Sequence, residues 1–286
     1  MLIMDHPEHT LNARILLTDG MTRRVFFLGI ALSGVIMSLV NTQSVSVLGQ
    51  DVLGPQSEYR IDTDIYSDEN KPPIHTTQTM FLGTRTIEWD DTHRRLILVD
   101  YQDQSVTLAD LSAQRKCRFP MQQLDERFSK LRSELTSQET ATWTSPSPAR
   151  IGDDGYYELA CERSIYRFKT KSPQAESMAM CYADFADWSV KMHAVNPPYK
   201  PPLLRLQLNS FLRDQRVLPM EIRLTDTRSG NSKPIVARLI VQDQLTAQDL
   251  DRIRDWEVLT STLKDVSQVE YFRQASAGPT SRAVRK

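Results

Sequence analysis

Segments of β-forming residues joined by polar turns follow one another, without an intervening helix, over a long stretch of chain beyond residue 58. Apolar and acidic residues alternate over 61–65 as in a half-buried strand, and residues 74–90 are expected to form one long strand. A polar turn at 90–93 separates it from the apolar run 96–99. Parallel strands need a crossover of about a dozen residues, which these turns do not supply. The pattern therefore predicts an antiparallel meander.

Four further segments repeat apolar residues at steps of three and four, which is typical of amphipathic helices that cover a sheet. They are residues 121–135, 176–195, 203–212 and 246–263. The last opens on Thr246 and Asp249, which have the spacing of a capping box. Between the last two, strands at 220–224 and 235–241 form a hairpin. We therefore predict an α+β fold, with an antiparallel sheet of about seven or more strands in hairpins and about four amphipathic helices against one face.

The segment 21–50 has the three-part layout of a secretory signal peptide. A basic pair, Arg23 and Arg24, precedes an uncharged apolar run over 25–40, and small and polar residues follow. The run is shorter than the about 20 residues that a bilayer-spanning helix needs. A cleaved signal is therefore favoured, and an uncleaved membrane anchor is the alternative.

The residues around the arginine pair, 22–27, also resemble the twin-arginine export signal. That resemblance implies a protein that crosses the membrane already folded, whereas an ordinary positively charged signal region is the alternative reading. Residues 1–20 carry three acidic side chains ahead of the pair, which is unusual in such a signal, so Met21 is a second candidate start.

We expect three regions along the chain. Residues 1–49 form an N-terminal extension plus signal peptide, 50–274 a single α+β domain, and 275–286 a small, polar and basic tail that is disordered. No internal repeat is evident. The three cysteines lack a CxxC spacing, so at most one disulfide can form, and buried free thiols are favoured. They are Cys117, Cys161 and Cys181.

The sequence FLGTRTIEWDDTHRRLILVDYQDQSVTLADL, in which a strand ending in Trp-Asp precedes an apolar strand, is similar to the bacterial outer-membrane lipoprotein carrier superfamily. In its order of strands and helices the resemblance extends over residues 58–243. It implies a curved, incomplete barrel closed by helices around an apolar cavity, which binds acyl chains without chemistry. No signature residue of the family can be carried over position by position.

Charge and aromatic patterning exclude a nucleic-acid partner. Lys and Arg number 35 against 36 Asp and Glu, so the net charge of -1 supplies no global field that would attract a polyanion. Aromatic residues alternate with Arg and Lys over 156–171, which superficially resembles a platform for single-stranded nucleic acid. A strand with aromatics inward and cations outward explains the same pattern, and export of the chain agrees with that reading.

The sequence offers little for catalysis or metal binding. Beyond the signal segment the histidines are His75, His93 and His193, which form no HxH or HExxH pair, so we expect no metal site and no cofactor. The GxSxG, GxxxxGKS/T and GxGxxG motifs are absent. Asp90, Asp91 and His93 form the best acid–base group, in which a carboxylate would orient an imidazole as general base. A polar β-turn explains these residues without chemistry and is favoured.

The predicted helix at 176–195 carries the best candidates for ligand contact. Met178, Phe185, Trp188 and Met192 lie on one face and would make an adaptable apolar wall. Plain packing in the core is the alternative.

We expect an exported, non-enzymatic protein of the periplasm or cell envelope that binds or carries a lipid-like apolar ligand. The alternative is an envelope structural or interaction protein, tethered to the inner membrane by an uncleaved helix at residues 25–40. A hydrolase that uses His93 with Asp91 is the third hypothesis. The sequence leaves the ligand, the oligomeric state and the fate of the signal open.

Overall fold

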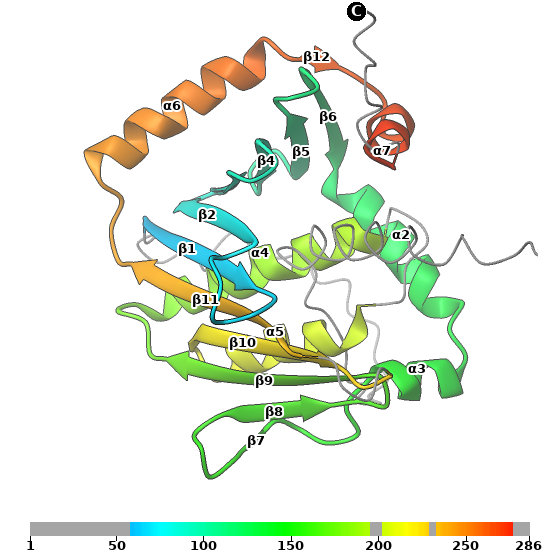
Figure 1. Ribbon diagram of the computed structural model, residues 1–286. Coiled ribbons are helices and arrows are strands. Elements are labelled where there is room, and N and C mark those ends of the chain that lie inside the picture. The colour runs from blue at the N-terminus through cyan, green and yellow to red at the C-terminus, as the bar shows by residue number, and fades with distance from the viewer. Residues whose placement is uncertain (1–57, 195–201, 229–232, 277–286) are drawn as a thin grey trace, which may run out of the picture.

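The computed structural model describes residues 58–194, 202–228 and 233–276 (Figure 1). Over these residues the fold is α+β, as predicted, with one curved, unclosed and mostly antiparallel sheet. The predicted export signal, with its arginine pair and apolar run, lies outside the described residues, and so does most of the predicted tail. Within the described part, no helix has both the length and the apolar character needed to cross a membrane.

The sheet has twelve strands. In spatial order they are β12 (Lys264–Asp265), β6 (Arg115–Pro120), β5 (Ser105–Asp110), β4 (Arg95–Asp100), β3 (Arg85–Asp90), β2 (His75–Leu82), β1 (Tyr59–Tyr66), β11 (Ile235–Gln242), β10 (Leu218–Asp226), β9 (Ser164–Lys171), β8 (Tyr157–Ala160) and β7 (Arg150–Ile151). Neighbouring strands are antiparallel except β12 and β6, which are parallel. The central strand β1 joins the meander β2 to β6 to the C-terminal hairpin through its pairing with β11.

The expectation of one long strand over residues 74–90 is wrong. The segment is a hairpin of β2 and β3, which turns at Gly83, whose φ of 60° lies in the left-handed region that glycine adopts without strain. The sequence does not indicate this turn, because the residues on both sides of Gly83 favour strands and because both faces of β2 and β3 contain buried residues. Continuous burial removes the alternation that would mark where a strand ends.

The next three hairpin turns share a ten-residue period that is not evident from the residue types alone. Each begins at an aspartate whose carboxylate accepts a hydrogen bond, 2.9 Å long, from the backbone N–H three residues later. The aspartates are Asp90, Asp100 and Asp110. One residue further on, each turn has a non-glycine residue at a φ near 50°, namely Arg94, Gln104 and Gln114. The chain therefore contains a short repeat of three turns. Each turn has one aspartate at its start and one residue with a positive φ four positions later.

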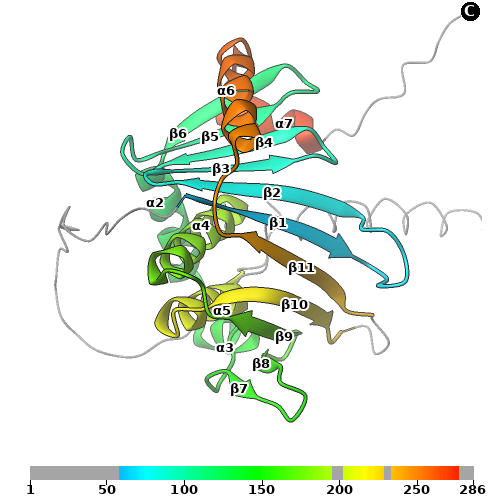
Figure 2. The ribbon, with the colours of Figure 1, turned by 90° about the vertical axis from the view of Figure 1, so that its left-hand side faces the viewer.

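Six helices are described, more than the four expected. They are α2 (Met121–Ser133), α3 (Ser137–Trp143), α4 (Glu176–Ala194), α5 (Leu203–Asp214), α6 (Ala247–Ser261) and α7 (Gln268–Ser276). The two additional helices, α3 and α7, are too short for apolar periodicity to reveal them. Figure 2 shows α2, α4 and α5 side by side on the inside of the curved sheet, which we call the inner face. The main core cluster lies between this face and the helices.

Helix α6 lies on the opposite, outer face, so the prediction that all helices cover one face is wrong (Figures 1 and 2). Its Trp256 stacks on Trp89 of β3, with ring centroids 5.5 Å apart, and the two belong to a second apolar cluster. The predicted capping box is confirmed, because Thr246 and Asp249 exchange both of its hydrogen bonds. Asp249 also accepts a hydrogen bond, 2.6 Å long, from Arg60 of β1. These contacts attach the beginning and the middle of α6 to the sheet.

None of the three cysteines forms a disulfide, which agrees with the preference for free thiols. Cys117 is buried in the core, and burial raises the pKa of its thiol to about 12. A thiol of this kind stays protonated at neutral pH and is a poor nucleophile. In this environment Cys117 acts as a small apolar side chain.

Candidate functional site

The apolar wall predicted on α4 lies against the inner face of the sheet. Met178, Phe185 and Met192 are buried in the main core cluster, and the half-buried Trp188 packs against it. The helix brings these residues together because their spacing returns the side chains to one face. The structure thus places all four predicted residues on one surface, although this placement agrees with core packing as well as with ligand contact.

An aromatic ladder connects the wall to the central strands. Tyr59 of β1 and Phe81 of β2 stack with ring centroids 4.2 Å apart, and the rings of Phe81 and Phe185 of α4 form a T-shaped pair with centroids 6.0 Å apart. The hydroxyl of Tyr59 donates a hydrogen bond of 2.7 Å to the backbone carbonyl of Met178. Burial raises the pKa of Tyr59, so this hydroxyl keeps its proton and remains a donor. The ladder holds the first half of α4 at a fixed position above β1 and β2.

Polar contacts join α4 to its neighbouring helices. Asp187 accepts hydrogen bonds from Arg213 and Asn209 of α5, at 2.6 and 2.7 Å. Lys191 donates to Asp125 of α2 at 2.6 Å. Charge-assisted hydrogen bonds of this length are among the stronger surface contacts in a protein. The three helices therefore form one unit that presents its apolar side to the sheet.

Polar residues also occupy one end of the inner face, which no sequence pattern indicated. Glu88 of β3 is 6% exposed and lies opposite Thr79 of β2, which donates a hydrogen bond of 3.3 Å to its carboxylate. Burial, and secondarily the charge of Asp90, raise the pKa of Glu88 to about 8. His75, at the beginning of β2, is 1% exposed, and burial lowers its pKa. The inner face thus combines an apolar centre with a buried polar end.

This polar end continues across the next strands. Asp110 of β5 lies between Arg95 of β4 and Arg115 of β6, with nitrogen–oxygen distances of 3.5 and 3.7 Å. The guanidinium of Arg115 lies 5.1 Å from the ring centre of Tyr271 on α7. Alternating charges on adjacent strands compensate one another, which permits their burial. These charge pairs cannot be read from a single sequence, because the charged residues become neighbours only through the register of the paired strands.

The proposed pairing of His93 with Asp91 is wrong. The carboxylate beside the His93 ring is that of Asp90, whose Oδ2 lies 2.9 Å from Nδ1. Asp91 instead accepts a hydrogen bond of 3.3 Å from the indole nitrogen of Trp89. The favoured interpretation of a polar turn is confirmed, since the carboxylate of Asp90 also accepts the backbone N–H of His93.

Two of the histidines lie close together although no HxH or HExxH spacing links them in the sequence. His75 and His93 each lie beside one carboxylate oxygen of Asp90, and their rings lie 5.3 Å apart, centre to centre. One possible ligand atom from each of the three residues lies within 4.8 Å of the others. The register of β2 and β3 creates this cluster, because Thr77, two residues after His75, lies opposite Asp90.

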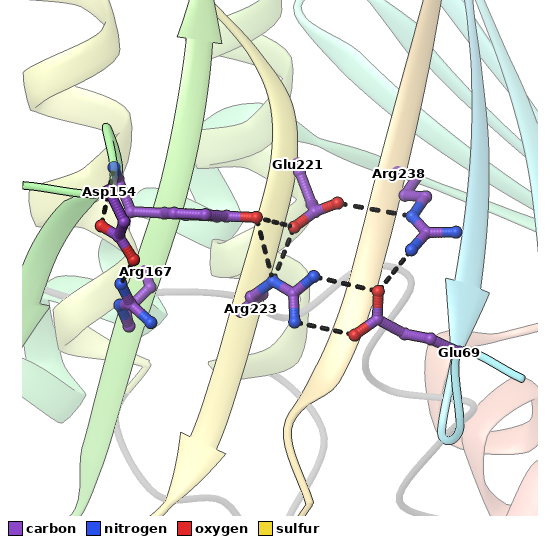
Figure 3. Close-up of polar contacts among 7 residues, drawn as sticks. Glu69, Asp154, Arg167, Glu221, Arg223 and Arg238 are labelled. Atoms are coloured by element: carbon purple, nitrogen blue, oxygen red, sulfur yellow. Dashed lines mark hydrogen bonds and ion pairs between the residues drawn. The ribbon is translucent and has the colours of Figure 1, made fainter.

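A second polar cluster lies on the outer face of β10 and β11 (Figure 3). Glu69, in the loop between β1 and β2, makes two hydrogen bonds of 2.7 and 2.9 Å with Arg223 of β10 and also pairs with Arg238 of β11. Glu221 accepts hydrogen bonds from Arg223 at 2.6 Å and from the hydroxyl of Tyr156 at 2.5 Å. The network fastens a loop to two strands, which is a structural role.

The segment 156–171 follows the arrangement expected of an ordinary strand. Tyr166 and Phe168 of β9 are buried in the core, while Arg167 and Lys169 lie on the other face. Arg167 is paired with Asp154 (Figure 3). Both cations also lie over the ring of Tyr156. These contacts agree with the interpretation of the segment as an ordinary strand with aromatic residues inward and cations outward.

We expect Glu69→Gln to lower the free energy of unfolding by about 1–2 kcal/mol, because it weakens two charge-assisted hydrogen bonds to Arg223 and removes one charge from the network. Urea denaturation at low and at high salt measures this loss, which should shrink as salt screens the network. Glu257→Gln is the control, since its pair with Arg85 is exposed and should contribute little. Equal effects of the two substitutions would show that the loop is not fastened by Glu69.

The architecture is that of a curved, unclosed antiparallel sheet with helices inside the curve. No protein-family model and no curated protein matches the chain. Eighteen solved chains match, and among them is a LolA superfamily protein from Nitrosomonas europaea, which is 10% identical. The match covers 69% of this chain and 90% of that one, with a TM-score of 0.27. This is a weak likeness to the superfamily that the strand pattern resembles, and it establishes no correspondence between individual residues.

Proposed function

We propose that the protein is exported to the periplasm or cell envelope, where it binds a lipid-like apolar ligand between α4 and the inner face of the sheet without catalysing a reaction. In this proposal residues 1–49 direct export, the domain at 50–274 binds the ligand, and residues 275–286 form a disordered tail. The alternative of a tether at residues 25–40 concerns only how the domain is held. It leaves the binding face unchanged.

The observation that supports binding is the composition of the two surfaces that meet inside the curve. Met178, Phe185 and Met192 supply flexible and aromatic apolar surface from the helix, and Phe81 supplies it from the sheet. Methionine adapts to ligands of variable shape because its chain is unbranched and polarisable.

Trp188→Ala should weaken the binding of a fluorescent fatty acid at least tenfold, because the half-buried indole would lose its contact with an acyl chain. Titration of the full chain, followed by fluorescence, measures the affinity. Trp143→Ala is the matched control, since Trp143 packs against a different apolar cluster. Circular dichroism verifies that both variants are folded.

Two results would contradict the proposal. The first is native mass spectrometry of protein recovered from the envelope that shows only the unliganded mass, together with no uptake of fluorescent fatty acid by the wild type. The second is an equal loss of affinity in the Trp188 and Trp143 variants. N-terminal sequencing of the same material tests export separately, since a chain that begins between residues 45 and 50 has lost its signal and cannot be tethered by it.

A further inference from the structure

Three side chains of metal-binding type meet at the polar end of the inner face. The nearest oxygen of Asp90 lies 3.5 Å from Nδ1 of His75, and its other oxygen lies 2.9 Å from Nδ1 of His93. His75 begins β2, Asp90 ends β3, and His93 lies in the turn that follows. Two of the three positions are therefore fixed by a strand pair, which provides a rigid base for a site.

The spacing of these atoms suits a tetrahedral ion. Zinc binds imidazole nitrogen and carboxylate oxygen at about 2.0–2.2 Å, which places neighbouring ligand atoms about 3.3–3.5 Å apart. The two separations from Asp90 lie within about half an ångström of that value. Rotation of the rings and the carboxylate would bring all three atoms onto one ion. Two nitrogens and one oxygen also favour zinc and similar transition metals over calcium and magnesium, which prefer oxygen ligands only.

The state of His75 is a second, independent observation. The side chain is 1% exposed, yet neither of its ring nitrogens has a hydrogen-bond partner among the described residues. Buried polar groups are almost always paired, because an unpaired one loses its hydration without compensation. An ion bound beside Asp90 would pair one nitrogen of the ring. The cluster therefore contains a buried donor atom that lacks the partner a metal would supply.

Comparison of the three repeated turns shows that the turn itself does not need a histidine. Asp100 and Asp110 accept the same backbone hydrogen bond as Asp90, yet Asp103 and Ala113 stand where His93 stands in the first turn. The side chain at this position is thus free to vary. The turn geometry accounts for Asp90 but not for the two imidazoles that face it.

We propose that His75, Asp90 and His93 bind one zinc ion, or a transition-metal ion of similar chemistry, with three protein ligands and one open coordination position. The proposal does not depend on the apolar ligand, because it rests on a different part of the inner face. With three ligands the site would resemble catalytic zinc sites, which leave a position for water or another small molecule.

Zinc binding to the metal-free full chain, measured by competition with a chromophoric chelator, tests the proposal. The wild type should bind one ion at this site and should gain thermal stability when zinc is added. His93→Gln should weaken the zinc affinity of this site at least tenfold and should lose the gain in thermal stability. Cobalt should give the wild type, but not the variant, the visible absorption bands of a tetrahedral complex.

A control separates loss of the site from loss of folding. Asp100→Asn removes the equivalent turn contact away from the site and should bind zinc like the wild type. Asp90→Asn should also weaken zinc binding. If this variant does not fold, the zinc affinity of the His93→Gln variant tests the proposal alone. A wild type that binds no zinc, or a His93→Gln variant with unchanged affinity and unchanged cobalt bands, would overturn the proposal.

Discussion

Glu88→Gln is expected to stabilise the protein by about 3 kcal/mol at pH 7 and to remove most of the fall in stability between about pH 4.5 and pH 8. The carboxyl of Glu88 is buried at the polar end of the inner face, and its pKa is raised to about 8 from an ordinary value of 4.5. Burial is the main cause, and the neighbouring charge of Asp90 adds to it.

The direction of the effect follows from proton binding. The folded state holds the proton of Glu88 more tightly than the unfolded state does, so the stability from this group is fully present below about pH 4.5. That stability is lost as the pH rises through the folded pKa of about 8, because the unfolded chain ionises first. From the unfolded pKa of 4.5 to pH 7 is about 2.5 pH units, and the folded state loses about 1.4 kcal/mol of stability over each unit. Glutamine keeps the shape and the hydrogen bond to Thr79 but never ionises.

Chemical denaturation across this pH range, with a chelator present to keep the protein metal-free, measures the effect. Glu158→Gln is the control, since the same substitution on a half-exposed side chain should leave the pH dependence unchanged. A Glu88→Gln variant with the same pH dependence as the wild type would show that Glu88 ionises normally and is not buried in solution.

Trp256→Ala is expected to lower the free energy of unfolding by about 3–5 kcal/mol and to release α6 from the outer face. Trp256 is 7% exposed and stacks on Trp89, and it is the larger of the two α6 side chains buried in the cluster beneath the helix. Its removal leaves a cavity between α6 and the sheet that the surrounding side chains cannot fill. The polar contacts that remain, from Asp249 to Arg60, Arg252 to Gln78 and Glu257 to Arg85, do not replace the buried apolar surface that the indole supplies.

Hydrogen exchange resolved along the chain distinguishes local release from general destabilisation. In the alanine variant the amides of residues 247–261 should exchange much faster, while those of the central strand β1 keep their protection relative to global unfolding. Trp256→Phe, which retains an aromatic ring, should cost less than half as much. Uniform acceleration across the whole domain would show that α6 is an integral part of the core and cannot detach.

The part of the candidate site that lies on one helix could be predicted from the sequence. The part that forms where several strands meet could not. The wall of Met178, Phe185 and Met192 follows from helical spacing alone, because residues on one face of a helix share surroundings wherever it packs. His75 and Asp90 meet only because β2 and β3 pair in one register. A shift of one residue would move either side chain to the opposite face of the sheet. No local pattern contains that information.

The sequence by itself determined the α+β class, the antiparallel meander, most of the longer helices and the capping box of α6, since each depends on contacts between residues close along the chain. Only the tertiary structure decided that α6 covers the outer face, that Glu88 is buried and that two distant histidines share one aspartate. Strands β2, β4 and β5 carry apolar residues on both faces, so periodicity alone does not say which face a helix will cover. That choice is made by the packing of the whole sheet.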